Sequence, residues 1–213
     1  MVSLVSVRGL EFGYGQGSSV LSDWNGDFFA GEIIAITGPS GRGKSTLLYI
    51  LGLMIKPRSG VVLVDGRAAS ELKDAERARL RAFLFGFVFQ DAALDPTRTV
   101  LDNVIESSMY RQESLSRSKV RALELMEQFG VALRASHKPG QVSGGQAQRI
   151  ALCRALLNDP KIILADEPTG NLDAVSSAVV MEAFRGQANS GSTVIVATHD
   201  PNLVAQCDRR IEI

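Results

Sequence analysis

The chain has 213 residues and a formal net charge of zero, with 45% hydrophobic and 22% charged residues. These values are ordinary for a globular domain, and the length suits one domain or a core with a small inserted subdomain. Because lysine and arginine are not in excess, the sequence excludes the basic surface typical of nucleic-acid-binding proteins, and we expect no nucleic-acid partner.

The first ~30 residues and residues 60–66 are predicted to form antiparallel strands. In the second stretch the apolar run Val61–Val64 is followed by Asp65 and Gly66, a pair typical of hairpin turns. We therefore expect a small antiparallel β-subdomain in the N-terminal part of the chain.

Continuous apolar runs predict the strands of a second sheet, at residues 33–37, 84–89, 161–165 and 193–197. Most of these runs do not alternate with polar residues, which suits strands buried on both faces of a parallel sheet. Helical stretches lie between them, at about residues 45–54, 146–157 and 174–188. This order predicts an α/β fold with a mainly parallel sheet.

Residues 98–140 have a helical pattern and contain no strand candidate. The segment 116–129 is charged and amphipathic, and Gly130 is suited to cap it. We expect one domain over the whole chain, with a helical subdomain at about 91–140 inserted into a core made of residues 1–90 and 141–213.

A glycine-rich segment matches the phosphate-binding pattern G-x-x-x-x-G-K-[ST] and lies between a predicted strand and a predicted helix. Its glycines let backbone N–H groups surround phosphate oxygens, and the helix N-terminus adds partial positive charge. Lys44 is expected to bind the β- and γ-phosphates and Ser45 to bind Mg²⁺. The alternative is a plain glycine-rich turn. It is disfavoured because the pattern would occur by chance in only about one in a hundred chains of this length. The residues of this phosphate-binding segment, all expected to contact the nucleotide, are Gly38, Pro39, Ser40, Gly41, Arg42, Gly43, Lys44, Ser45 and Thr46.

Two adjacent carboxylates, Asp166 and Glu167, end the apolar run that precedes them. Charged groups rarely end a buried strand without a partner, although a helix cap or a surface ion pair is the alternative. Downstream of a phosphate-binding loop, Asp166 is expected to hold Mg²⁺ through water. Glu167 points elsewhere and is expected to polarise the water that attacks the γ-phosphate.

The segment Val142–Arg149 resembles the LSGGQ signature of the ATP-binding cassette (ABC) ATPases, with Val142 in the leucine position. It follows the helical region and precedes the paired carboxylates, as in that family. The alternative is an ordinary helix start in which Ser143 is the N-cap. The order of the motifs favours the signature, and the resemblance extends from residue 4 to residue 213.

The resemblance implies a head-to-tail dimer of two copies of the chain, with each ATP held between two subunits. The phosphate-binding loop of one copy faces the signature of the other, where a second helix N-terminus can donate hydrogen bonds to the γ-phosphate. The signature residues expected to bind ATP in trans are Ser143, Gly144, Gly145 and Gln146.

Further site residues follow from the same resemblance. Tyr14 resembles the aromatic residue that stacks on adenine, and Gln90 resembles the glutamine that contacts Mg²⁺ or the attacking water. His199 resembles the histidine that contacts the γ-phosphate. The alternative for Tyr14 is an ordinary surface tyrosine. For Gln90 it is a polar residue that ends a strand, and for His199 it is a structural histidine. The segment Asn171–Asp173 resembles the D-loop at the dimer interface, although Asp173 is equally suited to cap the next helix.

The run Glu167–Asp173 and the segment Leu94–Val104 are similar to the ATPases of macrolide exporters, lipoprotein-release complexes and the cell-division ABC complex. This similarity implies an ATPase that powers a separate transmembrane permease, by export or by mechanotransmission. The alternative is that the chain is the ATPase of a cell-envelope regulatory or cell-division complex that does not transport a substrate. A soluble ABC ATPase of DNA repair or translation is disfavoured, because this sequence has one cassette, no cysteine cluster and no basic stripe.

The expected location is the cytoplasmic face of the cell membrane, with the chain bound peripherally. No apolar run approaches the ~18–20 residues that a membrane-spanning helix needs. The segment Met1–Val5 has no basic region followed by an apolar stretch, so we expect no signal peptide. The two cysteines, Cys153 and Cys207, are too few for a disulfide framework, which favours a cytosolic protein.

Overall fold

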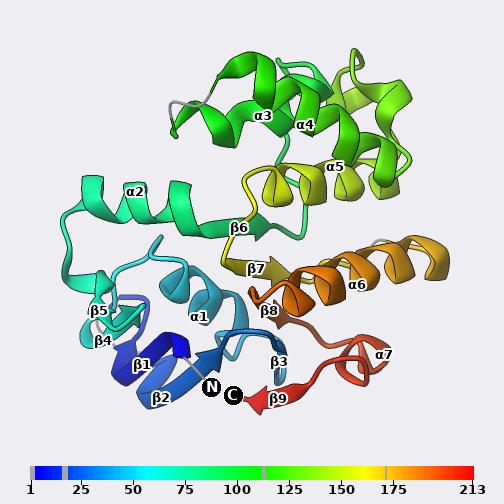
Figure 1. Cartoon of the computed structure of the whole chain (residues 1–213). Helices are drawn as coiled ribbons and strands as arrows, with labels where there is room; N and C mark the ends of the chain where they lie inside the picture. Colours follow the sequence, from blue (N-terminus) through cyan, green and yellow to red (C-terminus); the bar gives the residue numbers. More distant parts are fainter. Residues whose placement is uncertain (1–2, 16–18, 112–113, 171) are drawn as a thin grey trace.

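A computed structural model describes residues 3–15, 19–111, 114–170 and 172–213, and it contains two β-sheets flanked by helices (Figure 1). The first sheet is antiparallel and has the strand order β2-β1-β4-β5. Its strands are β1 (Ser3–Phe12), β2 (Leu21–Phe29), β4 (Ser59–Val64) and β5 (Arg67–Ala68). The expected hairpin is present, because Asp65 and Gly66 join β4 to β5 with positive φ angles of 50° and 74°.

The second sheet is parallel and has the strand order β6-β7-β8-β3-β9. All residues of β3, β7 and β8 are buried, as their continuous apolar sequences predicted. The strands are β3 (Ile33–Thr37), β6 (Phe85–Val88), β7 (Ile162–Asp166), β8 (Thr193–Ala197) and β9 (Arg209–Glu212). The predicted α/β fold is therefore confirmed.

The two faces of the parallel sheet pack into two separate hydrophobic cores. Ile34 and Leu164 face the core shared with helix α1 (Lys44–Leu51) and with the antiparallel sheet. Ile33 and Ile163 face the core shared with α5 (Gly144–Leu156) and α6 (Ala174–Asn189). Because helices cover both faces, only the strand ends are left for polar chemistry, and Figure 1 shows α1 and α5 on opposite sides of the sheet.

Two helices, α3 (Val100–Met109) and α4 (Leu115–Gln128), occupy the region that the sequence predicted to be helical. They pack against each other and against α5, at the top of Figure 1. Thr99 caps α3 by accepting a hydrogen bond from the backbone N–H of Asp102 at 3.1 Å. Gly130, with φ of 66°, follows the end of α4 as expected. The division of the chain into a core and an inserted subdomain stays a prediction.

Three local features differ from the sequence-based expectation. Helix α1 ends at Leu51 rather than residue 54, because Leu53 adopts a left-handed conformation with φ of 58°. Helix α2 (Asp74–Leu84) was not predicted, and Leu84 belongs to it rather than to the following strand. No residue of α2 is fully buried, although Leu80 and Leu84, four residues apart, pack against the core. The short helix α7 (Pro201–Val204) was also not predicted.

Within the part of the chain that the structure describes, no helix is both long enough and apolar enough to cross a lipid bilayer.

Candidate nucleotide-binding site

The phosphate-binding loop connects the end of β3 to the start of α1. Gly38, Gly41 and Gly43 have φ angles of 148°, 77° and 99°, which residues with a Cβ atom rarely adopt. The Lys44 ammonium group donates hydrogen bonds to the carbonyl oxygens of Gly38 at 2.9 Å and Pro39 at 3.1 Å. The loop therefore curls around this ammonium group, in the geometry expected of a cradle for phosphate oxygens.

A buried carboxylate lies directly beside this loop. Asp166, at the end of β7, is 6% exposed and accepts a hydrogen bond from the Ser45 hydroxyl at 3.0 Å. The Tyr49 hydroxyl donates to its second oxygen at 3.2 Å. Burial raises the pKa of Asp166, and the hydrogen bonds from Ser45 and Tyr49 oppose that rise. The ionised carboxylate is thus held in an environment that disfavours its charge.

Sequence reasoning missed Tyr49, although a signal was available. Tyr49 is four residues after Ser45 on α1, so both side chains project from the same face of the helix. Burial and the charge of Asp166 raise the pKa of Tyr49, which keeps its hydroxyl protonated as a donor.

Glu167 points in a different direction from its neighbour, as expected. Its backbone has φ of 45°, and its N–H donates to the carbonyl oxygen of Ala197 at 2.9 Å. One carboxylate oxygen accepts from the Thr198 hydroxyl at 3.0 Å, and the other lies 2.7 Å from Nδ1 of His199. Thr198 and His199 follow β8, which pairs with β7, so neighbouring strand ends bring these groups together.

His199 is exposed on its outer side and lies close to the phosphate-binding loop. Its side chain is 75% exposed, whereas that of Glu167 is 13% exposed. His199, Thr198, Gly38 and Pro39 all line one cavity of about 550 Å³. A γ-phosphate held by the loop would therefore have both His199 and Glu167 nearby. Thr198 was not among the residues predicted from the sequence, although it directly precedes His199 and follows a buried strand.

Tyr14 stands next to the first turn of α1. Its hydroxyl is 3.0 Å from the Thr46 hydroxyl, and its ring packs edge-on against Phe12 with centroids 5.1 Å apart. The side chain is 58% exposed, which leaves ring surface open to solvent beside the loop. Such a surface is suited to stacking on a purine base.

Gln90 lies exposed in the turn after β6. Among the described residues, Gln90 makes no hydrogen bond to Ser45 or Asp166, so its expected approach to a metal ion stays a prediction. Gln148 of α5 donates to the carbonyl oxygen of Phe89 at 3.3 Å and ties this turn to α5.

The signature residues form the N-terminus of α5, with Ser143 as N-cap. Ser143 accepts from the Gln146 N–H at 3.3 Å, and the Gln146 side chain accepts from the Ser143 N–H at 3.0 Å. Ser143 and Gly144 are exposed. A Cβ on Gly145 would contact Leu172 and Ser176 of the α6 region. Within the described part of the chain, no hydrogen bond joins these residues to the phosphate-binding loop.

Asp173 of the D-loop candidate takes the helix-capping role, and its compatible role at a dimer interface stays a prediction. Asp173 caps α6 by accepting from the Ser176 N–H at 2.7 Å, and this hydrogen bond lowers the pKa of Asp173. Asn171, the first residue of that segment, lies outside the described residues.

Comparison with known proteins decides the family. The family model described as "ABC transporter" matches residues 21–170, which is more than half of the chain. The chain belongs to the ABC transporter family. As a member of this family it is an ATP-binding ATPase, so the activity predicted from the sequence is confirmed.

Individual ABC proteins are similar over nearly the whole chain. The lipoprotein-releasing system ATP-binding protein LolD of Paramagnetospirillum magneticum is 44% identical over 91% of this chain and 86% of its own length. The macrolide export ATP-binding/permease protein MacB 1/2 of Paracoccus denitrificans is 42% identical over 99% of this chain but only 32% of that protein. The dimeric structure of the cassette MJ0796 has a TM-score of 0.92 and 37% identity, and covers 98% of this chain and 94% of the other.

The described geometry fits a hard divalent cation such as Mg²⁺. Ser45 and Asp166 place a hydroxyl and a carboxylate 3.0 Å apart, and oxygen atoms are the ligands that Mg²⁺ prefers. A cation between them would also compensate the buried charge that raises the pKa of Asp166.

The Asp166→Asn variant should gain stability and lose activity. Because the folded-state pKa of Asp166 lies above its ordinary value of 3.8, its ionisation at neutral pH opposes folding. Replacing it with a neutral side chain should raise the thermal midpoint of the nucleotide-free protein at pH 7. This gain should vanish as the pH falls below 3.8, where Asp166 is protonated in both states. ATP turnover should fall by about 10²-fold or more.

Asp173→Asn is the matched control, because the pKa of Asp173 is shifted downwards. Its ionised form favours folding, so this substitution should lower the midpoint slightly at pH 7. Thermal melts across pH check both signs, and a lower midpoint for Asp166→Asn at pH 7 would contradict the burial argument.

Proposed function

We propose that this ABC ATPase powers a separate membrane permease, as the peripheral subunit of a lipoprotein-release type of machine at the cytoplasmic face of the membrane. The observation that carries the proposal is the arrangement of catalytic groups at neighbouring strand ends. Similarity to LolD over 86% of its length supports the choice of process, because that relative is named for lipoprotein release.

In the proposed reaction, Lys44 and the loop glycines hold the phosphates of ATP. Ser45 and Asp166 would hold Mg²⁺, with Gln90 as a further expected ligand, and such an ion would supply positive charge beside the β- and γ-phosphates. Tyr14 stacks on the adenine. These residues fix the position of the γ-phosphate at the edge of the parallel sheet.

Glu167 is the proposed general base for the attacking water. Its carboxylate is held by Thr198 and His199, so its orientation is fixed before ATP binds. A carboxylate within reach of the γ-phosphate can orient water and accept its proton during in-line attack. His199 lines the same cavity as Gly38, which supports its proposed role as a donor to the γ-phosphate.

The second half of the ATP site is proposed to come from another copy of the chain. The N-terminus of α5 presents exposed Ser143 and Gly144, and such a terminus attracts phosphate. Because α5 and α1 lie on opposite sides of the sheet, one chain does not bring its own signature to its own loop. The dimeric form of the similar cassette MJ0796 supports a two-chain arrangement.

A groove of about 530 Å³ between α2, β6 and α3 is the proposed docking site for a cytoplasmic segment of the permease. Its floor contains stacked aromatic rings, with centroids 5.8 Å apart for Phe85 and Phe87 and 6.0 Å apart for Phe87 and Phe89. Tyr110 at the rim is 70% exposed. The aromatic floor lies in the strand that leads to Gln90, so an occupant of the groove would be coupled directly to the nucleotide site.

Glu167→Gln should bind ATP but lose turnover by about 10²–10⁴-fold, because the general base is lost while the loop is intact. Slow turnover should trap the ATP-bound dimer, which light scattering would report as about twice the 22.9 kDa chain mass. The Glu167→Gln/Ser143→Arg double variant is the control and should stay monomeric while still binding ATP. Wild-type turnover in Glu167→Gln would refute the role of Glu167.

Tyr110→Asp should break the permease interaction while ATP binding is retained, because it places a charge at the rim of an apolar groove. The matched control is Leu133→Asp, since Leu133 is 91% exposed and does not line the groove. The tagged proteins are purified from gently solubilised native membranes, and the companions are identified by mass spectrometry. A permease recovered with wild type and Leu133→Asp but not with Tyr110→Asp supports the proposal. Recovery of soluble proteins alone with wild type contradicts the transport function.

A further inference from the structure

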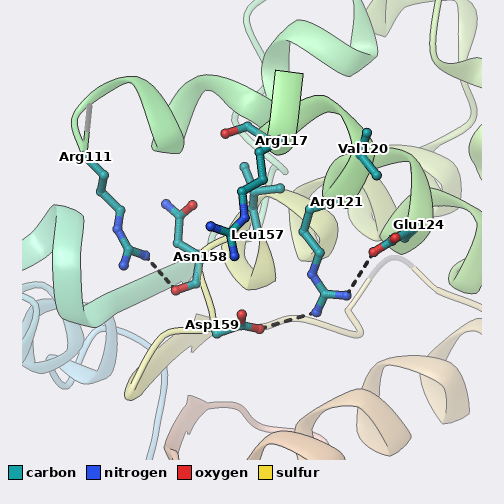
Figure 2. Close-up of a pocket in the computed structure, with 9 residues that line it drawn as sticks. Arg111, Arg117, Val120, Arg121, Glu124, Leu157, Asn158 and Asp159 are labelled. Atoms are coloured by element: carbon teal, nitrogen blue, oxygen red, sulfur yellow. Dashed lines mark hydrogen bonds and ion pairs between the residues drawn. The ribbon is translucent and has the colours of Figure 1, made fainter. Parts of the chain in front are cut away.

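A cleft of about 680 Å³ separates the N-terminal half of α4 from the turn after α5. Arg111, Arg117 and Arg121 line it from the helical side, and Asn158 and Asp159 line it from the turn. Figure 2 shows the arginine side chains directed towards the turn, across the space between the two elements. None of these residues belongs to the nucleotide site.

The carboxylates of the cleft are both engaged by one arginine. Arg121 forms ion pairs with Asp159 at 3.4 Å and with Glu124 at 3.5 Å. These side chains are between 42% and 74% exposed, so the pairs are weak and can rearrange. Arg117 is exposed and has no hydrogen bond or ion pair within the described part of the chain.

Arg111 is held in a fixed position at the other side of the cleft. Its guanidinium donates to the Asn158 carbonyl oxygen at 2.7 Å and lies over the Phe83 ring, 5.2 Å from its centroid.

We propose that this cleft binds a phosphate group, with Arg117 and Arg111 as its principal ligands. Guanidinium groups match phosphate oxygens in bidentate geometry, and charge-assisted hydrogen bonds of this kind are stronger than neutral ones. Arg111 follows α3 and Arg117 lies on α4, so a phosphate bound to both would connect the end of α3 to the start of α4. The cavity has room for a phosphate ester as well as for the free ion.

Two sources of phosphate share this chemistry: the headgroup of an anionic phospholipid and a small phosphate ester in solution. The cleft adjoins the groove proposed for the permease, because Asn158 lines both. Val120, which is 59% exposed, adds an apolar side chain to the lining. The phosphate site itself does not depend on the proposed function, and the trapped dimer of Glu167→Gln tests that function separately.

The test measures binding in two arms, with saturating ADP to occupy the phosphate-binding loop. One arm floats the full chain with phosphatidylcholine vesicles that contain or lack phosphatidylglycerol. The other titrates glycerol 3-phosphate by calorimetry. Wild type should bind in at least one arm, and Arg117→Ala should weaken that binding by about tenfold, the effect of one charge-assisted hydrogen bond.

Lys119→Ala is the charge-matched control, because Lys119 is exposed on the same helix but does not line the cleft. It should bind as wild type does. Arg117→Gln, a second substitution at the same position, should weaken binding as Arg117→Ala does. Thermal melts verify that each variant is folded. Binding in the vesicle arm alone identifies a lipid headgroup, and binding of glycerol 3-phosphate identifies a soluble ester. No binding in either arm, or an equal loss with Lys119→Ala, would overturn the proposal.

Discussion

The parallel pairing of three fully buried strands, β3, β8 and β7, is the constraint on which the nucleotide site depends. Helices and the antiparallel sheet cover both faces, so polar groups reach solvent only where strands end. The phosphate-binding loop follows β3, the two carboxylates end β7, and Thr198 and His199 follow β8. Because parallel strands end at the same edge, segments distant in sequence become neighbours around one phosphate position.

The two adjacent carboxylates are separated by backbone geometry rather than by residue type. Asp166 is the last residue of β7 and lies buried with the hydroxyls of α1, whereas Glu167 turns away with φ of 45°. Burial favours a role for Asp166 as the partner of a cation, since a cation relieves the cost of its charge. Glu167 keeps a partly accessible carboxylate that is held by Thr198 and His199. This is the basis for proposing that one dipeptide supplies both a cation ligand and a base.

Much of this arrangement was predictable from sequence, because buried strands and glycine-rich loops leave strong local patterns. The interactions of Tyr49 and Thr198 were not predicted, because their partners Asp166 and Glu167 come from another element of the fold. Their sequence positions, four residues after Ser45 and directly before His199, were the available signals. Helix α2 was not predicted, although Leu80 and Leu84 recur at helical spacing and pack against the core. The cleft beside α4 was not predicted either. Charged residues on an amphipathic helix are typical of a solvated face, and the turn after α5 that lies opposite them is distant in the sequence.

The central claim, that each ATP is enclosed by two copies of the chain, is tested most directly by crosslinking. In a Glu167→Gln/Cys207→Ser background, Ser40→Cys is introduced into one subunit and Ser143→Cys into a differently tagged subunit, and the mixture is treated with a short bismaleimide. The remaining Cys153 is buried. The account predicts a crosslinked heterodimer that forms with ATP and not without it. Absence of an ATP-dependent crosslinked product between the two differently tagged chains would contradict the shared site.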